Sequence, residues 1–379
     1  MGLTADSGFA ELGGWPGTLG RLIGGGELSR EEARSVFCEI LGGEATPAQI
    51  ASFVTALRMK GESIDEMAGF VRAMLDHAEP LTVSGDLVDT CGTGGDRSSS
   101  INVSTIAAFV VAGAGARVCK HGGRAATSVA GSADVLEALG VVIDLGPDGV
   151  ARCIKEARMG FCFAPRFHPA MRFAAPVRRE LGVPTVFNYL GPLANPGRAC
   201  FQVVGVSDPA MADKMLGVLA LNGCRRAMVV HGADNLDELS TTGPTTIFEL
   251  LDTGGDAGAH DAGSQNAGSQ NAGSQNAATR LRKTTIDAAD LGLPRATLDD
   301  LRGSDPAANA MVVGRVLSGE KGPHRDIVVL NAAAALVVAG LAEDFPAGVE
   351  RAAAAIDDGR AAAVLETLIR VSQECAESP

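Results

Sequence analysis

From about Leu87 onward, the sequence alternates short apolar runs with segments long enough to form a helix. Short apolar runs of this kind are typical of strands that are buried on both faces of a sheet. When strands and helices alternate along a chain, the strands form a mainly parallel sheet with helices packed against it. The runs expected to be strands are 87–88, 117–119, 141–143, 161–163, 228–230 and 327–330, the last leading into an alanine-rich helix that ends at Gly340. The fold class predicted for this part of the chain is therefore α/β.

The N-terminal part has a different pattern, with three helix starts in succession. In each, a hydroxyl residue is followed three positions later by an acid or amide that can return a hydrogen bond to the first residue's N–H. The pairs are Ser29/Glu32, Thr46/Gln49 and Ser63/Glu66. We therefore expect a small helical domain over residues 1–82, joined by a helical segment near 178–198, and an α/β domain over residues 83–379.

A repeat interrupts the α/β domain. The pentapeptide GSQNA occurs three times in tandem over residues 263–277, and a polar, glycine-rich segment of this kind cannot bury an apolar face. It lies between two expected strands, 245–251 and 280–285. We expect a flexible hairpin insertion over residues 254–278, to which we assign no function.

Composition narrows the class of protein. The chain has 379 residues and is 46% hydrophobic, enough for a large core, and its formal net charge is -13. Such an acidic chain is poorly suited to a general grip on nucleic-acid phosphates. The eight cysteines include no C-x-x-C pair, so we expect reduced core residues. The sequence shows neither a signal peptide nor an apolar stretch of membrane-spanning length, which favours a cytoplasmic enzyme with no membrane partner.

A glycine-rich loop follows the first expected strand. Residues 89–96 read DTCGTGGD, and NVST at 102–105 opens a helix shortly afterwards. Glycines allow several backbone N–H groups to converge on one anion, and a helix N-terminus adds partial positive charge. The loop is therefore a candidate phosphate site, although a tight strand-to-helix turn is the alternative for such a cluster taken alone.

Two further loops lie at the same edge of the predicted sheet. Residues 120–128, KHGGRAATS, supply a cation, free amides and hydroxyls, and the carboxyl ends of parallel strands open on one side. Two anion-binding loops favour a substrate with two phosphate groups. Asp237 and Glu238 follow the strand at 228–230, and adjacent carboxylates bind magnesium that is shared with substrate phosphates. Taken singly, an ordinary surface loop and a solvated acidic pair are the alternatives.

In this order, the motifs resemble the anthranilate phosphoribosyltransferase family. Its GTGGD, N-x-S-T, K-H-G-x-R-A and D-E motifs are present, as are FCFAPRFHP at 161–169 and VRRELGVPTVFNYLGPL at 177–193. The resemblance covers roughly residues 18–372. It implies a nucleoside phosphorylase/phosphoribosyltransferase-like fold and transfer of a 5-phosphoribosyl group from phosphoribosyl pyrophosphate (PRPP) to the amine of anthranilate, in tryptophan biosynthesis. It also implies a homodimer formed through the helical domain.

The resemblance further implies roles for individual residues. PRPP would be bound by Gly92, Gly95, Asp96, Ser100, Asn102, Val103, Ser104, Thr105, Lys120, His121, Gly122, Gly123, Arg124, Ala125, Ala126, Thr127, Ser128 and Ser132. Anthranilate would be bound by Gly92, Gly123, Pro165, His168 and Arg178. The guanidinium of Arg178 would pair with the anthranilate carboxylate; without the surrounding motif, a helix-surface arginine is the default interpretation.

For the metal, the resemblance implies two Mg²⁺ ions held by Ser104, Asp237 and Glu238, with Ser104 and Glu238 on one and Asp237 and Glu238 on the other. The arylamine of anthranilate is a free base at neutral pH, so attack needs no catalytic acid or base. Lys120 and Glu238 would act electrostatically.

Two departures from the family pattern bear on the acceptor. Gly123 stands where the family has asparagine, which predicts weaker anthranilate binding or a different acceptor. Ser100 replaces a threonine but keeps the hydroxyl. The alternatives are a paralogue with another acceptor, a pyrimidine nucleoside phosphorylase, and a catalytically silent nucleic-acid-binding relative. A phosphorylase would carry a different glycine-loop motif and an extra C-terminal domain, and the silent relative a basic face without the acidic pair.

Overall fold

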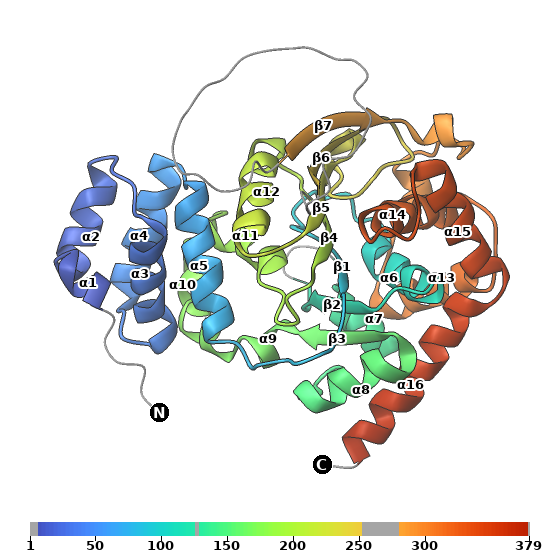
Figure 1. Cartoon of the computed structure of the whole chain (residues 1–379), viewed down its shortest axis with the longest axis horizontal. Coiled ribbons are helices and arrows are strands. Elements are labelled where there is room, and N and C mark those ends of the chain that lie inside the picture. Colours follow the sequence, from blue (N-terminus) through green and yellow to red (C-terminus); the bar gives the residue numbers. More distant parts are fainter. Residues whose placement is uncertain (1–6, 126–128, 252–279, 378–379) are drawn as a thin grey trace, which may run out of the picture.

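The computed structural model describes residues 7–125, 129–251 and 280–377 (Figure 1). A small helical bundle packs beside a seven-stranded sheet that has helices on both faces. This confirms the predicted class, a helical domain plus an α/β domain. In the described ranges, no helix combines the length and apolarity needed to cross a membrane. No disulfide joins the eight cysteines, all of which lie in these ranges.

The bundle forms where the capping signals predicted it. Its helices are α1 (Ser7–Glu11), α2 (Gly14–Ile23), α3 (Arg30–Gly42), α4 (Pro47–Lys60) and α5 (Ile64–Asp76). All three reciprocal caps are present; at the first, the Glu32 N–H donates to Ser29 Oγ (3.3 Å) and the Ser29 N–H donates to Glu32 Oε2 (2.8 Å). Two helices from the middle of the chain, α10 (Ala175–Leu181) and α11 (Phe187–Leu193), contact α4 and α5 respectively.

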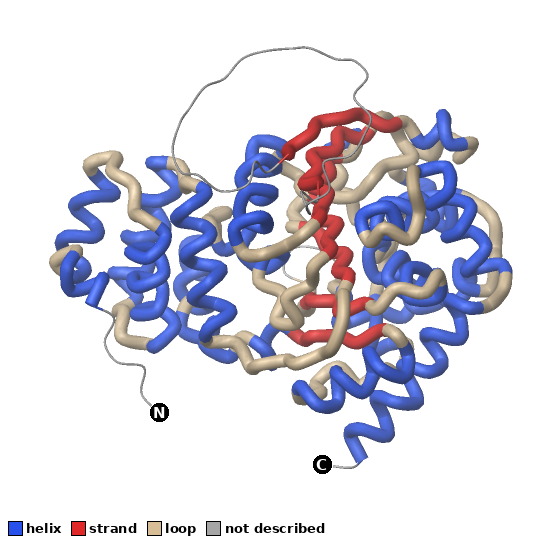
Figure 2. The backbone as a smooth tube through the Cα atoms, in the orientation of Figure 1, coloured by secondary structure: helices blue, strands red, loops and turns tan. Residues whose placement is uncertain are grey.

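The sheet has the strand order β3-β2-β1-β4-β5-β6-β7 (Figure 2). The strands are β1 (Val88–Gly92), β2 (Val118–Gly122), β3 (Met159–Phe163), β4 (Phe201–Gly205), β5 (Arg226–His231), β6 (Thr245–Leu251) and β7 (Arg280–Ile286). The strand pairs from β3 through β2, β1 and β4 to β5 are all parallel. The pairs β5–β6 and β6–β7 are antiparallel. The chain builds outward from β1 on one side and from β4 on the other, so a topological switch point lies between these two strands. Crevices at such points are where open α/β sheets bind ligands.

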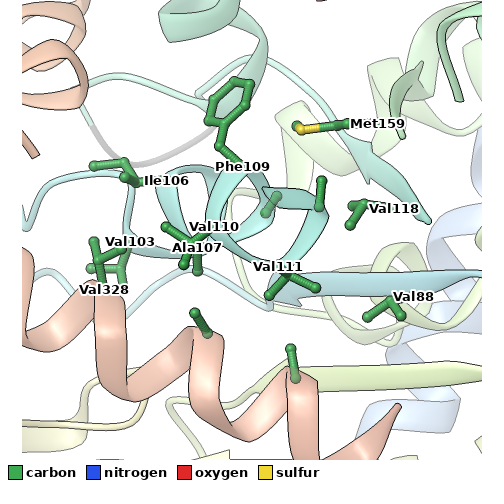
Figure 3. Packing of buried hydrophobic residues seen from close by; sticks show 14 of the residues in the cluster. Val88, Val103, Ile106, Ala107, Phe109, Val110, Val111, Val118, Met159 and Val328 are labelled. Atoms are coloured by element: carbon green, nitrogen blue, oxygen red, sulfur yellow. The ribbon is translucent and has the colours of Figure 1, made fainter. Parts of the chain in front are cut away.

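Two apolar cores hold the layers together. One face of the sheet packs against α6 (Val103–Gly113) and α14 (Pro323–Val338), with Val111 of α6 next to Val88 of β1 (Figure 3). The other face packs against α12 (Ala212–Leu221) and the bundle, in one continuous cluster. The remaining helices are α7 (Ser132–Ala138), α8 (Pro147–Ala157), α9 (Ala164–Phe167), α13 (Pro306–Leu317), α15 (Phe345–Asp357) and α16 (Arg360–Glu377), with short 3-10 turns at Pro169–Phe173, Pro209–Met211, Ala233–Asn235, Ala288–Leu291 and Asp299–Leu301.

Two strand expectations are wrong, and one strand was not predicted. The run 327–330 lies inside α14, because Pro323 starts a helix that continues through the alanines; a short buried apolar run does not distinguish strand from helix. The run 141–143 is buried but outside the sheet, and the Val142 N–H donates to Ser372 Oγ (3.1 Å). Strand β4 was missed, although FQVVG is an apolar run after a Pro-Gly turn. The hairpin pairing of β6 with β7 is confirmed. The insertion predicted over residues 254–278 lies outside the described residues.

Candidate active site

A cavity of about 310 Å³ opens at the carboxyl edge of the parallel strands, beside the switch point. Three of the segments that line it are the loops singled out in the sequence. The lining comprises residues 91–105, 120–125, 129–132, 237–238, 303–304 and 309. The glycine-rich turn, the basic loop and the acidic pair therefore surround one space, as expected if they share one ligand.

Close backbone approach explains the glycines after β1. A Cβ on Gly92 would lie 2.2 Å from Asp237 Oδ2, and one on Gly205 would lie 1.5 Å from the Asp237 carbonyl oxygen. Gly94 and Gly95 have φ of 68° and 81°, a region that disfavours residues with a Cβ. The Gly94 N–H donates to Asp237 Oδ2 (2.7 Å). Asp237 is thus held between the ends of β1 and β4, where only glycines leave room.

Lys120 is the buried cation of the site. Its side chain is 2% exposed, and Nζ donates to the Thr90 carbonyl (2.5 Å) and lies 3.4 Å from Ser104 Oγ. Beneath it, the fully buried Asp89 accepts hydrogen bonds from Asn195 Nδ2 (2.7 Å) and from the His121 N–H (3.3 Å). Burial raises the pKa of Asp89, while the charge of Lys120 acts in the opposite direction. This arrangement fixes the ammonium group at the cavity wall.

The acidic pair concentrates negative charge opposite Lys120. Burial and the nearby Asp96 carboxylate raise the pKa of Asp237 to about 7. Burial and the adjacent Asp237 raise the pKa of Glu238 well above its usual value, against a hydrogen bond from the Ser104 N–H (3.1 Å). Oxygen ligands short of a counterion suit Mg²⁺. Among the described residues, no group of three or more acidic, histidine or cysteine side chains is arranged to hold a metal ion.

All the described PRPP residues expected from the sequence line the cavity; Ala126, Thr127 and Ser128 lie outside the described residues. Three acceptor residues do not line it: Pro165, His168 and Arg178. His168 is 5% exposed, its Nε2 is 2.9 Å from the Ala194 carbonyl oxygen, and its ring centroid lies 5.1 Å from that of His121. His121 lines the cavity, and His168 lies next to it outside the lining.

Arg178 lies on α10, with its guanidinium 5.2 Å from the centroid of the Phe187 ring. Burial lowers the pKa of this guanidinium, and in the described ranges no carboxylate lies within ion-pair distance of it. A partly desolvated arginine of this kind is suited to receive a carboxylate. On the cavity side, a Cβ at Gly123 would be 3.9 Å from its nearest neighbour, Ala164 Cβ, so the space that an asparagine would fill is open.

Sequence reasoning missed the segment around Gly303, Ser304 and Asn309, which completes the cavity wall. The sequence does contain a helix start here, with Asp305 as cap and Pro306 at the first position. Nothing in that signal connects the segment to a loop some 200 positions earlier, however; the Asn309 to Asn102 contact spans 207 residues.

Comparison with known proteins places the two domains of this fold in one class. Residues 84–362 match the α/β domain of the glycosyl transferase family, and residues 17–78 match its helical bundle domain. A crystal structure of anthranilate phosphoribosyltransferase from Thermus thermophilus superimposes with a TM-score of 0.82 at 39% identity, covering 94% of this chain and 99% of that one. The enzyme of that name from Saccharomyces cerevisiae, in complex with PRPP and Mg, gives 0.81 at 26% identity, covering 95% and 98%.

Curated sequences narrow the class. Anthranilate phosphoribosyltransferase from Chloroflexus aggregans is 50% identical over 348 residues, which is 92% of this chain and 95% of that protein. The same enzyme from Thermomicrobium roseum is 49% identical over 362 residues, 95% and 97% respectively. The chain belongs to the anthranilate phosphoribosyltransferase family.

Proposed function

We propose that this protein transfers the 5-phosphoribosyl group of PRPP to the amine of anthranilate, releasing pyrophosphate, as a step of tryptophan biosynthesis. The observation that carries the proposal is the single cavity shared by the glycine loop, Lys120 and the acidic pair. The names of relatives at about half identity, and the yeast relative solved with PRPP and Mg, support the same reaction.

The donor half of the reaction uses groups that are already in place. The loop 92–96 and the N-terminal end of α6 line the cavity, the helix N-terminus contributes partial positive charge there, and Lys120 adds a fixed cation. We infer that these groups bind the phosphates of PRPP. As the bond from C1 of the ribose to pyrophosphate breaks, negative charge grows on the pyrophosphate oxygens, and fixed donors stabilise that charge without reorganisation.

Ser104, Asp237 and Glu238 are the residues that we assign to magnesium. When bound, Mg²⁺ would neutralise the pyrophosphate charge. We propose two ions, one on Ser104 and Glu238 and one on Asp237 and Glu238. Each carboxylate accepts a backbone hydrogen bond on one oxygen, from Gly94 or Ser104, and still has oxygen lone pairs for a metal ion.

In the acceptor half, the protein mainly has to position anthranilate, because the attack needs no catalytic base. The neutral arylamine attacks C1 directly, and its nitrogen gives up a proton only after the bond has formed, so no side-chain base is assigned. We propose that the anthranilate carboxylate pairs with Arg178, and that Pro165 and His168 shape its approach past His121. The amine would then meet C1 beside Gly92 and Gly123. Excluding water at that point protects the donor from hydrolysis.

The assembly that we propose is a homodimer through the helical domain, which we place at residues 1–82. Ile23 on α2 and Met59 on α4 are 77% and 85% exposed, and these two helices pack together. Exposed apolar side chains on adjacent helices are typical of a surface that is buried in an assembly. Light scattering that returned the mass of one chain at micromolar concentration would contradict this assembly.

The reaction is tested with the full chain, PRPP, MgCl₂ and anthranilate, by following loss of anthranilate fluorescence and release of pyrophosphate in parallel. We expect both signals, in equal amounts, and loss of both when EDTA is added. The open space at Gly123 favours a second candidate, the same transfer to a different aromatic amine. Pyrophosphate release with another amine but not with anthranilate would replace the acceptor; no turnover of PRPP with any amine would refute the enzyme assignment.

A further inference from the structure

The segment 301–304 pairs with the donor loop from a distant part of the chain. The Ile101 N–H donates to the Leu301 carbonyl (2.9 Å), and the Gly303 N–H donates to the Ser99 carbonyl (2.7 Å). A Cβ on Gly303 would lie 2.8 Å from the Ser100 carbonyl oxygen, so the two backbones meet without room for a side chain. The loop that is proposed to bind PRPP therefore leans on a second strand of backbone just before α13.

Asn309 extends this contact into the cavity through side chains. It is 4% exposed and lies in the first turn of α13. Its Oδ1 accepts from the Ser304 N–H (2.8 Å), and its Nδ2 donates to Asn102 Oδ1 (2.9 Å). Asn102 Nδ2 in turn donates to the Ala130 carbonyl (3.0 Å). This relay of two amides links residues 304, 102 and 130, which stand on three different segments of the cavity wall.

Neither amide does the usual work of its position. Asp305 caps α13, accepting from the Ala308 N–H (2.9 Å), so Asn309 is not needed for that purpose. Asn102 is the N-cap residue of α6, yet its side chain makes no capping bond. It points instead along the line from Asn309 to Ala130.

The relay has one polarity. If the Asn102 amide turned over, its oxygen would face the Ala130 carbonyl and its nitrogen would face the Asn309 nitrogen, so like poles would meet at both ends. In the observed orientation, the relay leaves one N–H and one oxygen lone pair of the Asn102 amide unused. Asn102 is part of the cavity wall. Asn309 therefore decides which Asn102 atom a ligand meets.

We propose that Asn309 is a positioning residue for the donor: it orients the Asn102 amide, and through it the loop 98–102, for PRPP. The inference rests on the proposed function of the cavity. Asn309 acts on PRPP binding before any chemistry, since it reaches the donor only through Asn102 and the loop. We assign it no part in holding anthranilate, because the acceptor side chains of Pro165, His168 and Arg178 lie outside the cavity lining to which Asn309 belongs.

Asn309→Asp tests the polarity without changing the shape. A carboxylate can still accept from the Ser304 N–H, but it sets an oxygen against Asn102 Oδ1. We expect the KM for PRPP, and its Kd measured by calorimetry with Mg²⁺ and without anthranilate, to rise about tenfold, the loss of one buried hydrogen bond with a repulsion in its place. The anthranilate KM and kcat at saturating PRPP should stay within about threefold of wild type.

Two control variants separate this role from charge and from stability. Ala307→Asp adds a carboxylate on an exposed position of the same helical turn, and Asp305→Ala removes the cap of α13 while leaving the relay intact. Neither should change the KM for PRPP, although Asp305→Ala should lower the Tm. If either control raises the KM for PRPP as much as Asn309→Asp does, the proposal is wrong.

A double-mutant cycle tests the route through Asn102. In an Asn102→Ala background, Asn309→Asp should have almost no further effect on the PRPP Kd, because the atom that it repels is gone. Additive effects would overturn the relay. If Asn309→Asp proves too unstable to purify, Asn309→Ser goes through the same cycle and is judged in the same way. Wild-type protein that fails to bind PRPP would refute the proposed function itself, whereas a wild-type Kd that Asn309→Asp leaves unchanged refutes only this inference.

Discussion

The donor half and the acceptor half of the site are built in different ways. The donor half consists of backbone amides, glycines and a buried lysine at the ends of β1, β2 and β5, all fixed by the hydrogen bonds of the sheet. Beyond Gly92 and Gly123, the acceptor half consists of the side chains of Pro165, His168 and Arg178, which stand on or between the short helices α9 and α10. The geometry of the donor half is set by the edge of the sheet, whereas the geometry of the acceptor half depends on how the linking helices are positioned.

Because the two halves are built differently, changes in each half should alter different kinetic constants. Groups held by a sheet are preorganised, so removing one costs transition-state stabilisation directly. Arg178 lies over the ring of Phe187 and does not line the cavity. We therefore expect changes in the donor half to lower kcat or to raise the KM for PRPP, and changes in the acceptor half to act mainly on the KM for anthranilate.

The largest effect is expected from Asp237→Asn with Glu238→Gln. Loss of both carboxylates removes the metal ligands, and turnover should fall by about a thousandfold or more. The fold should survive, because the raised pKa of each group shows that ionisation is already disfavoured there. Pyrophosphate release and circular dichroism are the measurements. Asp234→Asn, in the same loop but exposed, serves as the control; wild-type rates in the double variant would refute the metal assignment.

Arg178→Lys should weaken the acceptor half alone. Lysine keeps the charge but lacks the planar pair of donors that matches a carboxylate, so the anthranilate KM should rise about tenfold. The KM for PRPP should not change. Arg179→Lys, at the exposed neighbouring position, is the matched control. An equal rise in both KM values would mean that Arg178 supports the fold between the halves and does not contact the acceptor.

Gly123→Asn should improve anthranilate binding without changing PRPP binding. An asparagine here enters open space toward Ala164 and restores the amide of the family pattern, so the anthranilate KM should fall by about threefold to tenfold, the worth of one hydrogen bond. The KM for PRPP should change little. Initial rates with each substrate varied in turn give both constants, and an unchanged anthranilate KM would remove Gly123 from the acceptor pocket.

The same contrast explains what could be predicted from sequence. Donor-site motifs carry their chemistry locally: glycines at 92–95 and Lys120 stand next to strands, and parallel strands bring their carboxyl ends together, so one shared cavity could be expected. The capped bundle helices were equally legible, because a capping box lies within four residues. Asn309 could not be found in this way, since its role depends on a hydrogen bond across 207 positions.

Errors in the strand assignments have a related cause. The run 327–330 is apolar on every side because α14 is buried all around, and complete burial erases the periodicity that separates helix from strand. Its neighbours decide the matter: Pro323 favours a helix start, and the alanines that follow sustain it. Acceptor residues were named from motif alone. Their distance from the cavity depends on how α10 and α11 pack against the bundle, which no local pattern encodes.

The smallest expected effect is on stability. Asp237 has a folded-state pKa of about 7, above its usual value, so its contribution to stability is fully present at low pH and is lost as the pH rises through about 7. Mg²⁺ competes with protons for the same oxygens and binds better when they are ionised. Adding MgCl₂ should therefore raise the Tm by on the order of a few degrees at about pH 8, and by less at about pH 6.

Thermal melts at both pH values, with and without MgCl₂, measure this difference. In the variant with Asp237→Asn and Glu238→Gln, the Mg²⁺ effect should vanish at both pH values, and the metal-free protein should lose less stability on going from about pH 6 to about pH 8 than wild type does. A Mg²⁺ effect that is larger at the lower pH would contradict the acidic pair as its origin. In that case Lys120, and not the acidic pair, would determine the electrostatics of the donor half.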